Sequence, residues 1–212
     1  MKKDSQADLV YQEIRRRILI GQMESNARIT EDFWAKKLTV SRMAIREALT
    51  RLYGEGLVVA GEKGGYYVTE MKAEDVVEVR ELREIMELAA VRLAMDKISE
   101  SQLTDLENLC KDFSEMVQKG YILGACEADI KFHEMLVHSS GNERLLKSYH
   151  NAHIPLFHQK IGKSKGYVED YDLTNKEHLT IVEALRKKDL ALAQETLKNH
   201  FRRGELAILE MF

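Results

Sequence analysis

Apolar residues recur every three or four positions along most of the chain, which is the spacing that places them on one face of an α-helix. Near the N-terminus this spacing predicts a helix over residues 8–20 that ends at Gly21. A second helix is expected to begin at Thr30 and to stop near Thr39, and Ser41 is a suitable N-cap for a third. The third helix should end at the glycines that follow residue 53.

The pattern changes from a helical period to β structure in the segment "LVVAGEKGGYYV". Two short β-branched or aromatic runs flank Gly64 and Gly65, which supply the turn of a β-hairpin. Three helices followed by a hairpin is the element order of a winged helix-turn-helix, whose third helix enters the major groove of DNA. We therefore predict a winged helix-turn-helix DNA-binding domain over residues 1–72.

The remainder of the chain, residues 73–212, predicts a second domain of long amphipathic helices. In its first helix the apolar face is expected to hold Val76, Val79, Leu82, Met86, Ala89 and Leu93. Further helices are expected over 99–120, 122–139, 142–160, 175–186 and 189–211, and residues 161–173 should form a loop or a broken helix. About six helices in an antiparallel all-α bundle is the simplest arrangement, so the fold class is mainly α.

Composition supports a helical intracellular protein. A single proline in 212 residues favours long helices over turn-rich β structure. Cys110 and Cys126 lack CxxC spacing and fit a reducing compartment, while no apolar run approaches the length of a membrane span. We therefore expect a cytoplasmic protein without a membrane partner.

Charge is distributed unevenly, although the net charge is only −3. Basic residues cluster before residue 72, as expected for a module that binds anions. Arg42 and Arg46 lie four apart, opposite the apolar face, near the start of the predicted recognition helix, where side chains reach base edges or phosphates. For the run Arg15, Arg16 and Arg17 we prefer a solvated helix face.

The segment "DIKFHEML" places a carboxylate and an imidazole on one side of a helix, because Asp129 and His133 are four residues apart. Such a pair can be an ion pair, a buried polar pair or part of a metal site. His178 and His200 lie at nearly equal distances from the turn between two consecutive helices, so an antiparallel pairing brings them to one level. The surface or a hinge is expected for the other histidines, His138, His150, His153 and His158.

Three imidazoles and one carboxylate that meet in a bundle core would leave costly unpaired polarity without a cation. This donor set suits a borderline divalent ion, with zinc as the first choice and nickel, cobalt or manganese as alternatives. We therefore predict Asp129, His133, His178 and His200 as metal ligands.

The N-terminal segment resembles the DNA-binding domain of the GntR family of bacterial transcriptional regulators over residues 8–70. The segment "VSRMAIREALTRLYGEGLV" is similar to the family pattern V-S-R-x-x-[VIL]-R-E-A-L-x-x-L-x-x-E-G-L-[VI]. By position, this resemblance implies DNA contacts for Ser41, Arg42, Arg46 and Gly65. The chain departs from the common pattern at Met43-Ala44 and at Gly64-Gly65, so the operator sequence does not follow from the resemblance.

The C-terminal half resembles the FCD effector-binding domain of the FadR-type GntR subfamily. The matching segments are "LREIMELAAVRLA", "DIKFHEML", "GNERL" and "EHLTIVEALRKKDLALAQETLKNH". The ligand set of metal-containing members falls on the same four residues. The resemblance also implies that Arg83 grips the carboxylate of an effector, whereas its alternative role is a helix ion pair with Glu87.

These features predict a ligand-responsive transcriptional regulator that binds a palindromic operator as a homodimer and is modulated by a small organic acid. A metal-sensing regulator is one alternative, in which the ion itself is the signal. A metal-dependent hydrolytic enzyme is another, since an open metal site can activate water. Against an enzyme, no additional carboxylate is expected beside the ligands as a general base, and the DNA-binding module would have no role.

Overall fold

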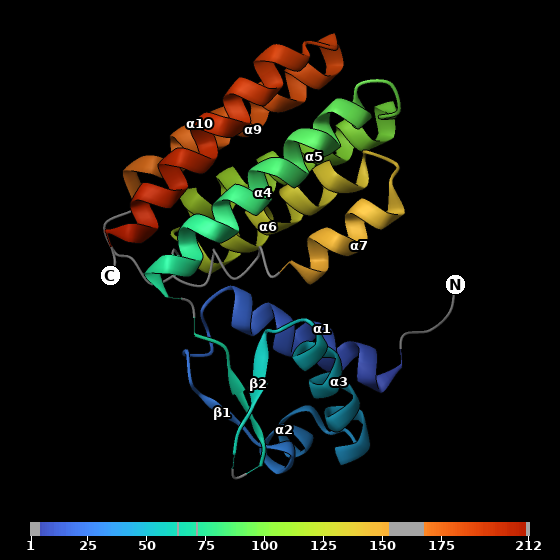
Figure 1. Ribbon diagram of the computed structural model, residues 1–212, viewed down its shortest axis with the longest axis vertical. Coiled ribbons are helices and arrows are strands. Elements are labelled where there is room, and N and C mark those ends of the chain that lie inside the picture. The colour runs from blue at the N-terminus through green and yellow to red at the C-terminus, as the bar shows by residue number, and fades with distance from the viewer. Residues whose placement is uncertain (1–4, 63, 71, 153–167, 211–212) are drawn as a thin grey trace.

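The structure, a computed structural model, describes residues 5–62, 64–70, 72–152 and 168–210. A bundle of long helices lies against a smaller unit of short helices and strands (Figure 1). The fold is mainly α, with a winged helix-turn-helix followed by an all-α bundle, as predicted. Among the described residues, no helix combines the length and the apolar character needed to cross a membrane.

The smaller unit contains the predicted helices and hairpin. Its elements are α1 (Gln6–Leu19), β1 (Arg28–Ile29), α2 (Glu31–Leu38), α3 (Arg42–Gly54), β2 (Val58–Ala60) and β3 (Tyr66–Val68). The strands form an antiparallel sheet in the order β1-β3-β2, in which Val59 pairs with Tyr67 and Ile29 pairs with Tyr66. The pairing of β1 with the hairpin was not predicted, because a two-residue strand carries no detectable alternation.

Local sequence explains where these helices begin and end. Ser5 and Asp8 form a capping box at the start of α1, and Ser41 caps α3. Thr39 adopts a left-handed conformation (φ 56°) after α2, so the chain turns tightly between the two helices of the helix-turn-helix. The core is formed by fully buried side chains, Ile14, Ile18, Ile45, Ala48, Leu49 and Leu52.

The bundle contains six helices within the described residues: α4 (Ala73–Ala94), α5 (Glu100–Gln118), α6 (Ile122–His138), α7 (Glu143–Asn151), α9 (Val168–Lys187) and α10 (Leu190–Leu209). Residues 168–173, for which a loop or a broken helix was predicted, belong to the start of α9. Residues 161–167, and the part of the predicted 142–160 helix beyond 152, lie outside the described residues. Phe132, Leu136, Ile181, Leu197 and Phe201 belong to the shared apolar core.

The buried face of α4 differs from the predicted one. Leu82 and Ala89, expected to be buried, are exposed, whereas Arg83 and Glu87 are buried together with Val76. The prediction oriented the helix by its apolar residues alone. The helix is rotated instead so that a charged pair lies in the bundle, and such a pair is stable there only with good hydrogen-bonding partners.

The bundle and the winged helix-turn-helix share apolar contacts. Ile130 of α6, Val76 of α4 and Ile208 of α10 are buried in the same cluster as Ile14 and Ile18 of α1. The expectation of a solvated face for the arginine run is wrong for Arg15 and Arg16, which form ion pairs with glutamates of α6.

Candidate functional site

The four predicted ligand residues come together inside the bundle from three helices. Asp129 and His133 lie one turn apart on α6, His178 is on α9 and His200 is on α10. All four are buried, and one potential ligand atom from each lies within 4.8 Å of the others. The antiparallel hairpin of α9 and α10 brings its two histidines to one level, as the sequence spacing predicts.

The histidines present their Nε2 atoms to the centre of this cluster. His133 Nε2 lies 3.2 Å from His200 Nε2 and 3.9 Å from an oxygen of Asp129. His178 Nε2 lies 3.2 Å from that same Asp129 oxygen, and its ring stacks on Phe132 at a centroid distance of 4.0 Å. The cluster is therefore compact, and apolar rings hold its histidines in place.

Two glutamates hold the outer ring nitrogens of two of these histidines. Glu87 of α4 has one oxygen 2.6 Å from His133 Nδ1, and its other oxygen accepts a hydrogen bond from the Tyr149 hydroxyl at 2.8 Å. Glu177 of α9 lies 2.9 Å from His200 Nδ1 and also pairs with Arg203. Carboxylates in this position fix the tautomer and the orientation of a ligating imidazole.

The electrostatics of the cluster favour neutral imidazoles at His133 and His200. Burial, reinforced by the nearby Arg83 guanidinium, lowers the pKa of His133 from 6.5 to about 3. Burial also lowers the pKa of His200. Burial alone would raise the pKa of Glu87, but His133 and Arg83 outweigh it and hold that pKa at about 2. Near neutral pH an ionised carboxylate therefore faces a neutral His133 ring.

The Nδ1 contacts of His133 and His200 with glutamates favour tautomers whose Nε2 lone pairs converge, and a cation fits that arrangement. A neutral His133 or His200 that donates Nδ1–H to its glutamate presents a lone pair at Nε2. These two lone pairs face each other and the Asp129 carboxylate, which also only accepts. Among the described residues, neither ring nitrogen of the buried His178 has a hydrogen-bond partner. A divalent ion would satisfy all of these groups at once.

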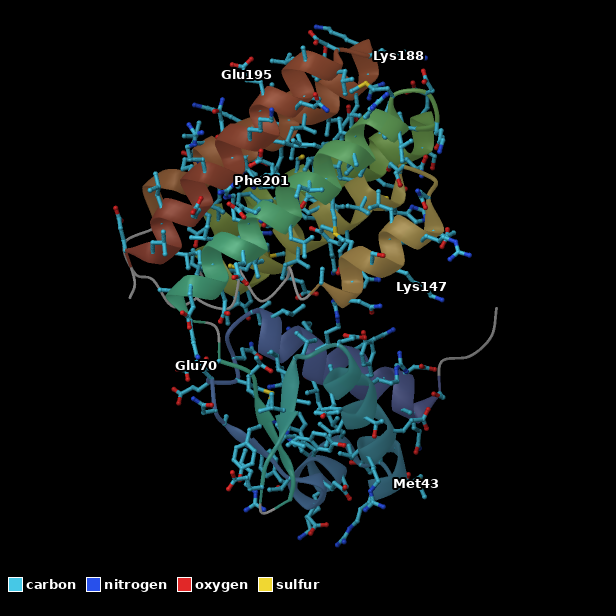
Figure 2. All side chains as sticks on the ribbon, viewed as in Figure 1. Met43, Glu70, Lys147, Lys188, Glu195 and Phe201 are labelled. Atoms are coloured by element: carbon cyan, nitrogen blue, oxygen red, sulfur yellow. The ribbon has the colours of Figure 1, made fainter. Side chains whose placement is uncertain are left out.

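Arg83 lies beside the cluster. Its Nε donates to Glu87 at 2.8 Å, and its guanidinium lies over the ring of Phe201 at 4.7 Å from the centroid. Figure 2 labels Phe201 within the bundle. The helix ion pair weighed from the sequence is thus formed, while the predicted contact of Arg83 with an effector stays a prediction.

The predicted DNA-contacting residues gather at the start of α3. Ser41 Oγ accepts the backbone N–H of Ala44 at 3.2 Å, so its side chain caps the helix. The Arg42 and Arg46 side chains are 70% and 62% exposed, which leaves both accessible to a DNA duplex. Each forms an ion pair with α2: Arg42 lies 2.6 Å from Asp32, and Arg46 bonds Glu31 at 2.9 and 3.0 Å.

The wing lies next to this surface. Gly65 adopts φ +85°, a conformation that side chains disfavour, at the tip of the hairpin between β2 and β3. A hollow of about 250 Å³ is lined by both Gly65 and Arg42, so the wing tip and the recognition helix border one surface. Met43, at 69% exposure, extends from the same end of the unit (Figure 2).

The sequence interpretation missed the residues that surround the cluster. Glu87 appeared only as a partner for Arg83, and no carboxylate was expected beside the ligands, yet Glu87 contacts His133 directly. A signal existed in α4: positions 76, 83, 87, 90 and 94 keep a helical period, and two of them are charged. Glu177 directly precedes His178 but points to His200, which only the packing of α9 on α10 decides.

A winged helix-turn-helix joined to a helical bundle with an internal cluster of ligand-type side chains defines a two-domain transcriptional regulator. The chain belongs to the family of bacterial regulatory proteins of the gntR type, which matches residues 6–68, and its residues 78–203 match the FCD domain.

Similar proteins agree with this family. The chain is 30% identical over 194 residues to an uncharacterized HTH-type transcriptional regulator, YdhC of Bacillus subtilis, covering 90% of this chain and 85% of that protein. It is 27% identical over 195 residues to the gluconate operon transcriptional repressor of Bacillus licheniformis, covering 89% and 79%. The structure of Escherichia coli McbR/YncC has the same fold, with a TM-score of 0.88 at 20% identity and 99% coverage of both chains.

Proposed function

We propose that this regulator binds a palindromic operator as a homodimer and is modulated by a small carboxylic acid at a metal-containing cavity. In this proposal residues 1–72 form the DNA-binding domain and residues 73–212 form the effector- and metal-binding domain. The observation that carries it is the buried convergence of three imidazoles and one carboxylate, whose potential ligand atoms lie within 4.8 Å of one another.

Asp129, His133, His178 and His200 would hold the ion through one carboxylate oxygen and three Nε2 atoms. Zinc suits this donor set best, and nickel, cobalt or manganese can use the same groups. When bound, the ion would offer its remaining coordination positions to an oxygen ligand such as a carboxylate. Glu87 and Glu177 would keep the His133 and His200 rings in the ligating tautomer.

A carboxylic acid is the proposed effector class for two reasons. Arg83 supplies a buried positive charge close to Asp129 and His133, so an acid at the ion would meet a second favourable charge. One similar protein is named as the transcriptional repressor of a gluconate operon, and gluconate is a sugar acid. Gluconate is therefore a reasonable first probe.

A second copy of the chain is the proposed partner of the bundle. Leu82 and Ile85 on α4 are 38% and 68% exposed, although both are large apolar residues on a helix of the bundle core. Covering them with a second copy would remove this apolar surface from water. A two-fold dimer also matches a palindromic operator, whose half-sites each take one recognition helix.

Regulation rather than catalysis is proposed because the carboxylate nearest the ligands is already engaged. Glu87 contacts Arg83, His133 and Tyr149, so it is held as a hydrogen-bond acceptor and not as a general base. Binding to operator DNA also implies a location in the bacterial cytoplasm.

The decisive test uses a DNA duplex selected in vitro by the purified chain. Its affinity is measured by fluorescence anisotropy with zinc-loaded and chelator-treated protein, each with and without gluconate or other short carboxylic acids. We expect an acid to change the DNA affinity of the zinc-loaded protein and to leave that of the chelator-treated protein unchanged. A response to chelation alone, with no response to any acid, would instead support the metal-sensing alternative. Failure to select any DNA duplex would refute the proposed binding to an operator.

A further inference from the structure

Helices α6 and α7 connect the metal cluster to the DNA-binding domain through two pairs of consecutive residues. On α6, His133 belongs to the cluster, and the next residue, Glu134, lies 2.9 Å from Arg15 of α1. On α7, Tyr149 bonds the same Glu87 that holds His133. The next residue, His150, lies 3.9 Å from Glu134. In both helices one residue faces the cluster and its neighbour faces the other domain.

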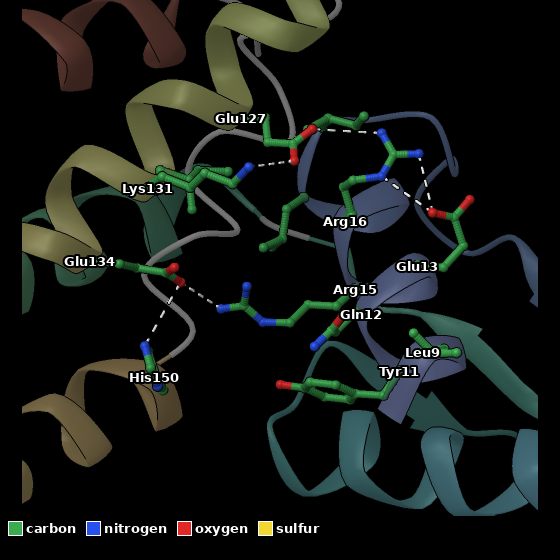
Figure 3. A pocket seen from close by; sticks show the side chains of 13 residues that line it. Leu9, Tyr11, Gln12, Glu13, Arg15, Arg16, Glu127, Lys131, Glu134 and His150 are labelled. Atoms are coloured by element: carbon green, nitrogen blue, oxygen red, sulfur yellow. Dashed lines mark hydrogen bonds and ion pairs between the residues drawn. The ribbon is translucent and has the colours of Figure 1, made fainter. Parts of the chain in front are cut away.

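Figure 3 shows the outer half of this arrangement. The Arg15 side chain extends from α1 to Glu134 and is only 18% exposed, so this ion pair is largely shielded from water. Two turns earlier on α6, Glu127 lies 3.7 Å from Arg16 and also bonds Lys131 at 3.0 Å. These groups line a cavity of about 690 Å³ between α1 and the bundle.

Apolar packing supports the same junction. Ile130, which directly follows Asp129 and lies one turn before Glu134, is buried in the cluster that contains Ile14 and Ile18 of α1. One helix therefore presents cluster residues on one side and domain-contact residues on the other. Packed helices move as units between discrete arrangements and do not deform continuously, so a change at His133 is transmitted to Glu134.

We propose that Arg15 and Glu134 form the contact through which occupancy of the metal cluster fixes the position of the DNA-binding domain. This inference rests on the proposed metal site and adds the residues that transmit its state. Filling the cluster orders His133 and α6, and α6 then holds α1 through the Arg15–Glu134 ion pair. Without that pair, the cluster still binds metal but no longer affects α1.

The test measures hydrogen exchange of the α1 amides, residues 6–19, in the full chain with and without one equivalent of zinc. Calorimetry on the same samples reports zinc affinity. The variants are Arg15→Gln, Glu134→Gln and the double substitution. The control is Glu115→Gln on α5, which removes an exposed ion pair with Lys119. Melting temperatures verify that each variant is folded.

We expect zinc to slow α1 exchange at least about fivefold, the lower end of typical coupling factors, in the unmodified chain and in Glu115→Gln. Both single variants and the double variant should bind zinc with unchanged affinity and lose this slowing of α1 exchange. The double variant should lose no more than either single variant, because the two residues form one contact. Tight zinc binding without any change in α1 exchange would overturn the coupling and leave the metal site intact. Persistence of the slowing in Glu134→Gln would also overturn it. Failure of zinc to bind would refute the metal site itself.

Discussion

His133 and His200 face each other with their Nε2 atoms 3.2 Å apart, while the Nδ1 atom of each ring is held by a glutamate. Two hydrogen-bond acceptors at this separation repel unless something positive lies between or beside them. This relationship supports the proposed cation site, since a divalent ion between the rings would remove the repulsion.

Metal analysis provides the first prediction. Purified protein should carry about one zinc per chain, and His178→Ala or His200→Ala should lose it. Zinc at 100 times its dissociation constant adds about 2.7 kcal/mol of stability, or roughly 5–11 °C in Tm for a chain of this size. His150→Ala, outside the cluster, is the control and should keep both metal and Tm. The metal site would be contradicted if the purified protein contained no metal and if added zinc or nickel did not raise its Tm.

The second prediction concerns Glu177, which orients His200 without belonging to the ligand set. Glu177→Gln should weaken zinc binding by roughly 10–100-fold, because a glutamine does not hold the Nδ1 proton as strongly as a carboxylate. Glu183→Gln on the same helix removes only an exposed pair with Lys187 and should bind zinc normally. Calorimetric titration distinguishes the two variants, and equal affinities would show that Glu177 has no orienting role.

The third prediction is a pH dependence of the chelator-treated protein. Since burial lowers the pKa of His133 from 6.5 to about 3, the unfolded chain takes up a proton below pH 6.5 that the folded chain does not. Stability should therefore fall as the pH decreases from 6.5 toward 3. Thermal melts should show a shallower fall in His200→Gln, since the pKa of His200 is also lowered by burial.

The fourth prediction concerns DNA. Arg42→Ala and Arg46→Ala should each weaken binding to a selected duplex by about 1–3 kcal/mol if the arginine contacts a base. Loss of a phosphate contact would instead lower the salt slope by about 0.9. Tm should remain nearly unchanged, because both side chains are exposed. Arg144→Ala removes an exposed arginine on α7 and controls for the change in net charge. Equal weakening of DNA binding in that variant would contradict the assignment of α3 as the recognition helix.

The fifth prediction separates the structural role of Arg83 from any effector contact. Arg83→Ala removes the cationic partner of the buried Glu87 carboxylate and should destabilise the fold by about 3–5 kcal/mol. Chemical denaturation measures this loss directly. A variant with unchanged stability would show that the ion pair matters little, and Arg83 would then be tested only as an effector ligand by acid titration.

The sequence predicted helix positions well where apolar period and capping residues agree, as at Ser41 and Ser99, which cap α3 and α5. The cluster itself was predictable because its geometry is local: a four-residue step on α6 and a symmetric hairpin. Glu87 was missed because apolar period alone chose the wrong face of α4. Arg15 and Arg16 were misread because contacts between domains leave no periodic signal in a charged helix.

The ion pairs of the recognition helix have a consequence for how the protein searches a chromosome. Arg42 and Arg46 are each paired with an acidic residue of α2, so a DNA phosphate must displace an anion that is already bound. A duplex that supplies only one phosphate to an arginine replaces its carboxylate partner with another anion, so the gain in binding free energy is small. A base edge that gives the guanidinium two hydrogen bonds gains more. If Arg42 and Arg46 contact DNA as proposed, the two carboxylates of α2 would therefore shorten residence at random sites and leave more of the protein free to reach its operator.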